Sequence, residues 1–129
     1  MRIFISVLMI LILPVMVVAQ DDPLAEYVWL KRPLVIFADS ENDPRFRLQM
    51  EMLAELPEEL EARDVVVLFD TDPAADSPLR QTLHPRDFML ILFSKDGKIA
   101  LRKPTPWTVR ELSASIDKMS IRIDELESE

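Results

Sequence analysis

Two groups of three acidic residues each follow an apolar run of strand length. The six residues are Asp39, Glu41, Asp43, Asp70, Asp72 and Asp76. Carboxylates placed together in this way could hold a cation or face a basic partner. A calcium loop of the EF-hand type is excluded, because its sixth position is not glycine and Met50 stands at its twelfth. The simpler interpretation is that Asp43 caps a helix and the others form a solvated edge.

Ser40, His84 and Arg86 are further polar residues whose types could take part in chemistry. If the third apolar run pairs antiparallel with the first, these residues lie beside Asp39. A serine, histidine and aspartate hydrolase can be drawn from them, but the sequence has neither a strained nucleophile turn nor glycines for an oxyanion loop. We therefore expect structural ion pairs, for example Arg86 with Asp39, and no catalytic residue.

The residue types that the chain lacks exclude several classes of function. It has no cysteine, one glycine (Gly97) and one histidine, so thiol redox chemistry, glycine loops that cradle phosphate and sites of several histidines are excluded. The formal net charge is −8, and no cluster of lysine and arginine offsets it. We expect no nucleic-acid binding, no metal and no cofactor, and a partner that is a protein or a small ligand.

Three apolar runs in the sequence are typical of strands covered on both faces, because they carry almost no polar residue. They are residues 34–38, 65–69 and 88–93. Between the first two runs, Asp43 and Pro44 begin a segment with apolar residues on one face, which predicts an amphipathic helix. Pro57 predicts a break near Leu56 and a short second helix that ends near Ala62.

The second half of the chain predicts a short helix, a hairpin and a C-terminal helix. The short helix covers residues 79–83, and Gly97 between apolar runs predicts the hairpin turn. Thr108 and Glu111 form a capping box that begins the last helix. Ser120 divides this helix from a loose acidic tail over 120–129. Alternatively, the apolar stripe from Val109 continues to Leu126 and forms a dimer contact.

The N-terminus indicates export. An uncharged apolar run over residues 3–18 ends before Ala19, and Val17 lies two positions earlier, which is the pattern that a signal peptidase reads. This predicts a signal peptide over 1–19 and a single mature domain over 20–129, periplasmic or secreted. The alternative is an uncleaved membrane anchor. After signal removal we expect no contact with a membrane.

The predicted order of elements is strand, helix, strand, short helix, hairpin and helix. Short motifs accompany it: LAEYVW at 24–29, LVIFAD at 34–39, DPR at 43–45, RD at 63–64, KDG at 95–97 and IDKM at 116–119. Together they resemble a bacterial family of exported domains of unknown function with a thioredoxin- or peroxiredoxin-like fold, related to a domain of animal sushi-repeat and extracellular-matrix proteins. The resemblance extends over residues 24–125. It implies a thioredoxin-like α/β fold, with a central mixed sheet of about four strands flanked by helices, and no established reaction.

These observations predict a cysteine-free, exported, thioredoxin-like domain that acts as a non-catalytic binding or accessory module. The candidate binding residues are Asp39, Ser40, Glu41, Asp70, Asp72, His84 and Arg86. The alternative function is a periplasmic stress-related enzyme with a metal-assisted or acid–base site at the same acidic edge. We expect a monomer, with a dimer through the C-terminal helix as the alternative.

Overall fold

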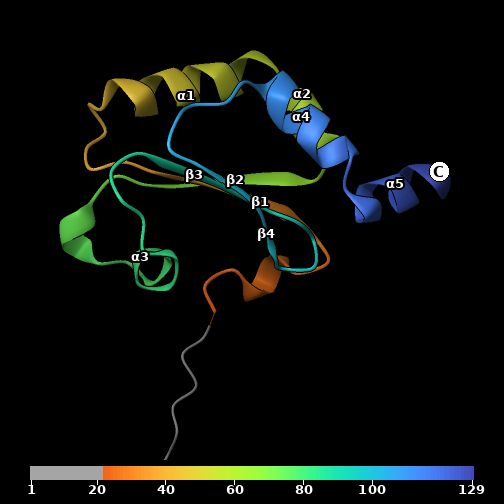
Figure 1. The fold of residues 1–129 in the computed structure, drawn as a ribbon, viewed down its shortest axis with the longest axis horizontal. Helices are drawn as coiled ribbons and strands as arrows, with labels where there is room; N and C mark the ends of the chain where they lie inside the picture. The colour runs from red at the N-terminus through yellow and green to blue at the C-terminus, as the bar shows by residue number, and fades with distance from the viewer. Residues whose placement is uncertain (1–21) are drawn as a thin grey trace, which may run out of the picture.

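A four-stranded mixed sheet with helices on both faces forms the centre of the computed structural model, which describes residues 22–129 (Figure 1). The predicted signal peptide over 1–19 and the predicted mature start at Gln20 lie outside the described residues. Within the described range, no helix has the length and apolar character needed to cross a membrane.

The strands lie across the sheet in the order β2, β1, β3, β4. Their bounds are β1 Arg32–Phe37, β2 Val65–Asp70, β3 Met89–Phe93 and β4 Ile99–Lys103. β1 pairs in parallel with β2 and antiparallel with β3, and β3 pairs antiparallel with β4. The predicted parallel βαβ unit, hairpin and C-terminal helix are therefore present, and the predicted α/β class is confirmed.

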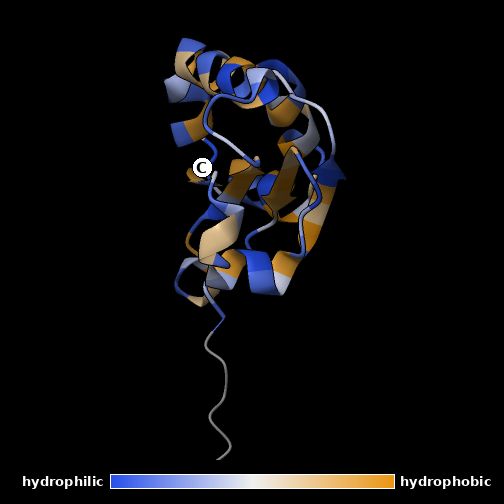
Figure 2. Ribbon diagram, turned by 90° about the vertical axis from the view of Figure 1, so that its left-hand side faces the viewer, coloured by the Kyte–Doolittle hydropathy of each residue, from blue (hydrophilic) through white to orange (hydrophobic). Residues whose placement is uncertain are grey.

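The helices form two layers on opposite faces of the sheet (Figures 1 and 2). Their bounds are η1 Ala25–Tyr27, α1 Pro44–Glu55, α2 Pro57–Glu61, η2 Pro73–Ala75, α3 Pro78–Leu83, α4 Val109–Asp117 and α5 Ser120–Glu127. α1, α2 and α4 pack on one face, where Leu34, Leu90 and Leu112 belong to one buried cluster. The N-terminal segment and α3 cover the other face, where Leu24 and Leu83 pack with Phe93.

Sequence signals for helix ends and turns are confirmed. Asp43 caps α1 by accepting the backbone N–H of Arg45 at 2.8 Å, and the helix ends before Pro57, as its missing donor requires. Thr108 caps α4 by accepting the N–H of Glu111 at 3.1 Å. Gly97 has a φ of 85° in the hairpin turn, a conformation that favours glycine.

Burial of the strands differs from the prediction at β2. β1 is buried along its whole length and β3 over four of its five residues, as predicted. β2 is only half-buried, and Phe69 is 58% exposed, although its sequence is as apolar as that of β1. The reason is topological, because β2 is the last strand at one edge of the described sheet.

The predicted loose acidic tail is wrong, because residues 120–127 form α5. Glu125 lies 3.3 Å from the buried guanidinium of Arg32 and 2.6 Å from the Lys95 amine, and these ion pairs hold the helix on the domain. Met119, with a ψ of 137°, separates α4 from α5. The apolar stripe predicted for a dimer contact is thus divided between two helices.

Candidate functional site

The acidic residues that follow β1 and β2 lie at one end of the sheet. Phe37, the last residue of β1, is paired with Asp70, the last residue of β2, so the loops after the two parallel strands leave the same edge. The antiparallel pairing of Phe37 with Met89 brings the segment before β3 to this edge as well. Open α/β sheets bind ligands at such an edge.

Asp70 is a structural residue of this edge. Its carboxylate accepts N–H bonds from Arg80 and from the backbone of Asp72, both at 3.0 Å, and a hydroxyl hydrogen bond from Ser77. Burial by itself would raise the pKa of Asp70, but these hydrogen bonds outweigh it and hold the pKa below its usual value. Arg80, buried, also donates to the carbonyl of Ala38 at 2.8 Å. The pair therefore ties the ends of β1 and β2 to α3.

A second group of ion pairs lies at the N-terminus of α1. The Arg45 guanidinium lies 2.8 Å from Asp43 and 2.7 Å from Asp87, and 5.7 Å from the centre of the Phe88 ring. The hydrogen bond from Arg45 lowers the pKa of Asp43. The segment before β3 is thus anchored by Arg45 and Asp87, and the predicted ion pair of Arg86 with Asp39 is not formed within the described residues.

Ser40 and His84 form hydrogen bonds with different partners and none with each other. The Ser40 hydroxyl accepts the backbone N–H of Asn42 at 3.1 Å, within its own loop. His84 ends α3 in the left-handed region with a φ of 47°, and its carbonyl accepts an N–H from Arg102 of β4 at 3.3 Å. The histidine is therefore placed by its backbone as a helix cap. This geometry supports a structural role better than a serine hydrolase.

Asp39, Glu41 and Asp72 remain as exposed acids at the edge, together with exposed Arg86. Within the described residues, the side chains of these three acids take part in no hydrogen bond or ion pair. Among residues 22–129, no three histidine, aspartate or glutamate side chains are arranged so that they could hold a metal ion. We call Asp39, Glu41 and Asp72 the acidic rim. The rim is thus a set of exposed carboxylates beside the carboxyl ends of β1 and β2.

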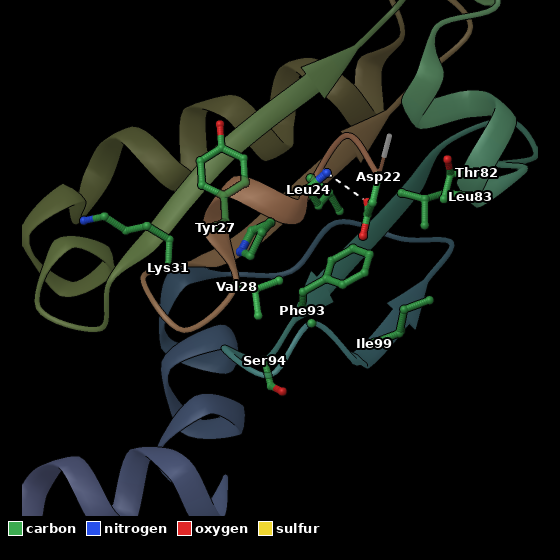
Figure 3. A pocket seen from close by; sticks show the side chains of 12 residues that line it. Asp22, Leu24, Tyr27, Val28, Lys31, Thr82, Leu83, Phe93, Ser94 and Ile99 are labelled. Carbon is green, nitrogen blue, oxygen red and sulfur yellow. Dashed lines mark hydrogen bonds between the residues drawn. The ribbon is translucent and has the colours of Figure 1, made fainter. Parts of the chain in front are cut away.

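A cavity of about 280 Å³ lies on the face of the sheet that the N-terminal segment and α3 cover. It is bounded by that segment, α3 and the β3–β4 hairpin (Figure 3). Its lining combines the apolar side chains of Leu24, Val28 and Phe93 with the Tyr27 ring. Burial raises the pKa of Tyr27, and the neighbouring charge of Glu26 acts in the same direction. The phenol stays protonated at neutral pH and can donate a hydrogen bond.

A buried arginine at the other end of the sheet is not indicated by the hydropathy pattern. Arg32 begins β1 with no exposed surface and donates to the carbonyl of Arg63 at 2.8 Å. Both oxygens of Glu125 lie 3.3 Å from its guanidinium. The apolar run begins only at Leu34, so hydropathy placed Arg32 outside the strand. Its only sequence signal is the following Pro33, which favours extended backbone at position 32.

Residues 23–125 match the family described as a domain of unknown function, DUF4174. The chain belongs to this family. The match covers most of the chain and nearly the same residues as the resemblance noted in the sequence, while the family description assigns no activity. No curated protein matches the chain.

Solved structures with a similar fold include two peroxiredoxins of malaria parasites. The reduced 2-Cys peroxiredoxin of Plasmodium vivax aligns with a TM-score of 0.60 and 13% identity, over 82% of this chain and 85% of that chain. The mitochondrial 2-Cys peroxiredoxin of Plasmodium falciparum aligns with a TM-score of 0.52 and 15% identity, over 81% and 83%. At this level of identity the likeness shows the fold, which is thioredoxin-like as predicted. The DUF4174 chain has this fold without a cysteine.

Proposed function

We propose that this DUF4174 protein is an exported, non-catalytic binding or accessory module that meets a protein partner through the acidic rim. The observation that carries the proposal is that the acids at the edge fall into two sets, one paired with arginines and one exposed. Asp43 and Asp70 are bound by Arg45 and Arg80, whereas the rim acids are exposed. Exposed charges of one sign govern encounter and partner choice more than stability.

The catalytic alternative at the same edge has less support. An acid–base mechanism needs a group with a displaced pKa that can reach a substrate. Asp43 and Asp70 have displaced pKa values, but their carboxylates are occupied by Arg45, Arg80 and Ser77. The lowered pKa also makes each of them a weaker base. The geometry therefore favours binding over catalysis.

Charge reversal of the rim tests the proposal. In the variant Asp39→Lys, Glu41→Lys, Asp72→Lys, we expect loss of cross-linked partner from periplasmic extract and an unchanged thermal melt, because exposed charges contribute little to stability. Asp43 is kept, since removing a helix N-cap costs about 1 kcal/mol and would confuse the two effects.

The matched control reverses three acids on exposed positions of α1 and α2. It carries Glu51→Lys, Glu55→Lys and Glu58→Lys, so the net charge changes equally. Capture that is lost in both variants would reveal a general charge effect, and capture retained by the rim variant would contradict the proposed binding surface. A collapsed melt of the rim variant would show that the acids are structural.

A further inference from the structure

The outer edge of β2 is unprotected against pairing with another strand. Within residues 22–129, β2 has β1 on one side and no strand on the other. Val65–Phe69 contains neither a charge nor a proline. Natural edge strands commonly carry a charged residue, a proline or a bulge that prevents pairing with a second chain. The Val65–Phe69 segment of β2 has no charged residue and no proline that would prevent such pairing.

The opposite edge of the same sheet has features that hinder such pairing. β4 carries Arg102 and Lys103 in its second half, and the pairing of β3 with β4 is irregular between Leu92 and Phe93. Lysine, arginine and irregular pairing are the features that discourage association through an edge strand. The contrast singles out β2 as the edge that another strand can join.

The backbone groups of β2 that point outward belong to alternate residues. The carbonyl of Asp64 accepts the N–H of Arg32 at 2.7 Å, and the carbonyl of Asp70 accepts the N–H of Ala38 at 3.1 Å. Because hydrogen bonding alternates along a parallel strand, even-numbered residues of β2 face β1. Val65, Val67 and Phe69 therefore direct their N–H and C=O groups toward the free edge.

The same edge carries a projection at one end and a hollow at the other. Phe69 is 58% exposed, and its ring centre lies 5.7 Å from that of Phe46. At the start of β2, an open hollow of about 380 Å³ is lined by Lys31, Pro57 and Val65, among others. The side chains of Val65, Val67 and Phe69 share one face of the sheet because they alternate along the strand.

We propose that β2 is an interface between two copies of this chain, paired antiparallel about a two-fold axis at Val67. Phe69 of each copy then lies opposite Val65 of the other and covers the hollow of its partner. All three outward-facing residues exchange both backbone hydrogen bonds in this register. The aromatic ring against a β-branched residue is a stabilising cross-strand pair. The self-complementary edge makes the second copy the partner of choice, and none of the three paired residues, Val65, Val67 and Phe69, belongs to the acidic rim.

Charges at the two strand ends are compatible with this pairing. The antiparallel register brings the exposed carboxylate of Asp72 toward the end of the other strand where Lys31 lies. The Lys31 side chain is 48% exposed, and its amine is 3.9 Å from Asp64 of its own chain. Asp64 and Asp70 come opposite each other, but each has its own counterion, Lys95 at 2.7 Å and Arg80 at 3.0 Å. Each chain carries a formal net charge of −8, so added salt should strengthen the dimer by screening the overall repulsion.

Sedimentation velocity over a range of concentrations tests the proposal, using protein expressed from the full sequence with its N-terminus recorded by intact mass. We expect a monomer–dimer equilibrium, and Phe69→Lys should raise its dissociation constant by about tenfold or more, because a charge would enter the paired edge. Ile99→Lys is the matched control, since Ile99 is an exposed apolar residue on β4. It should leave the equilibrium unchanged.

The absence of cysteine permits a second measurement of the register. In the Val67→Cys variant, the two introduced thiols should lie across the axis with Cα atoms about 5.5 Å apart, which suits a disulfide. We expect a covalent dimer under mild oxidation, and much less of it with Ile99→Cys. A monomer at every concentration, a dimer unaffected by Phe69→Lys, or equal cross-linking at both positions would overturn the proposal. Thermal melts of each variant establish that the domain is folded.

Discussion

Among the described residues, three of the five buried polar side chains are arginines, namely Arg32, Arg80 and Arg122. Arg80 donates to the carbonyl of Ala38, directly after β1, and to that of Asp70, the last residue of β2. Its guanidinium lies 5.4 Å from the centre of the Phe37 ring. Arg32 acts at the other end through the carbonyl of Arg63. Planar guanidinium groups with several donors suit this task, because each can satisfy carbonyls and a carboxylate at once. The ends of the parallel strands β1 and β2 are therefore held together by Arg80.

Gly97 gives a prediction at the level of one residue. Its φ is 85°, and a Cβ atom added there would lie 3.4 Å from Cγ2 of Val28. We expect Gly97→Val to lower the free energy of unfolding by about 1–3 kcal/mol, because a β-branched residue is strained at positive φ. Gly97→Asn is the control, since asparagine tolerates this region better. Equal denaturant midpoints for the two variants would contradict the prediction that the positive φ of Gly97 decides the cost.

Most elements follow from local signals, and the exceptions depend on contacts distant in sequence. Asp43, Pro57, Gly97 and Thr108 mark helix ends and a turn that the structure reproduces. The exposure of β2 follows from strand order, which hydropathy does not contain. α5 depends on Glu125 reaching Lys95 and Arg32, residues 30 and 93 positions away. For the candidate site, the sequence indicated that the acids lie at one edge of the sheet. It did not indicate which of these acids form ion pairs with Arg45 and Arg80.

The docking of α5 predicts a dependence of stability on pH. Burial by itself would raise the pKa of Glu125, but Lys95, Arg32 and Arg122 outweigh it and lower the pKa from 4.5. Because the folded-state pKa is lowered, the stabilisation from Glu125 is fully present above its unfolded pKa and is lost as pH falls through the folded value. Chemical denaturation between neutral and acidic pH should show this loss.

Glu125→Gln tests the origin of that loss. At neutral pH we expect it to lower the free energy of unfolding by about 1–3 kcal/mol, since hydrogen bonds to charged groups contribute this much. Its stability should also fall less steeply in acid. Glu127→Gln is the control on the same helix, where the glutamate is exposed. If the two variants have the same pH dependence, the ion pairs of Glu125 do not hold α5 in solution.

As a whole molecule, the protein combines a thioredoxin-like fold with a sequence that contains no cysteine, so packing and ion pairs stabilise it without disulfides. Each face of the sheet has its own buried cluster, and the ion pairs of Arg80 with Asp70 and of Lys95 with Glu125 lie at opposite ends of the sheet. A domain without disulfides is as compatible with an oxidising compartment as with a reducing one. The proposed location therefore rests on the N-terminal sequence.

Export is the prediction at this scale. If residues 1–19 are a signal peptide, protein expressed from the full sequence in a bacterium should appear in the periplasmic fraction with a mass that begins at Gln20. The physical reason is that Val17 and Ala19 present small or short side chains directly before a polar segment. Ala19→Arg places a large charged side chain at the cleavage position, so we expect it to block processing while the unchanged apolar run still directs the chain to the membrane. A wild-type protein that keeps Met1 and fractionates with membranes would show that the run is an anchor instead.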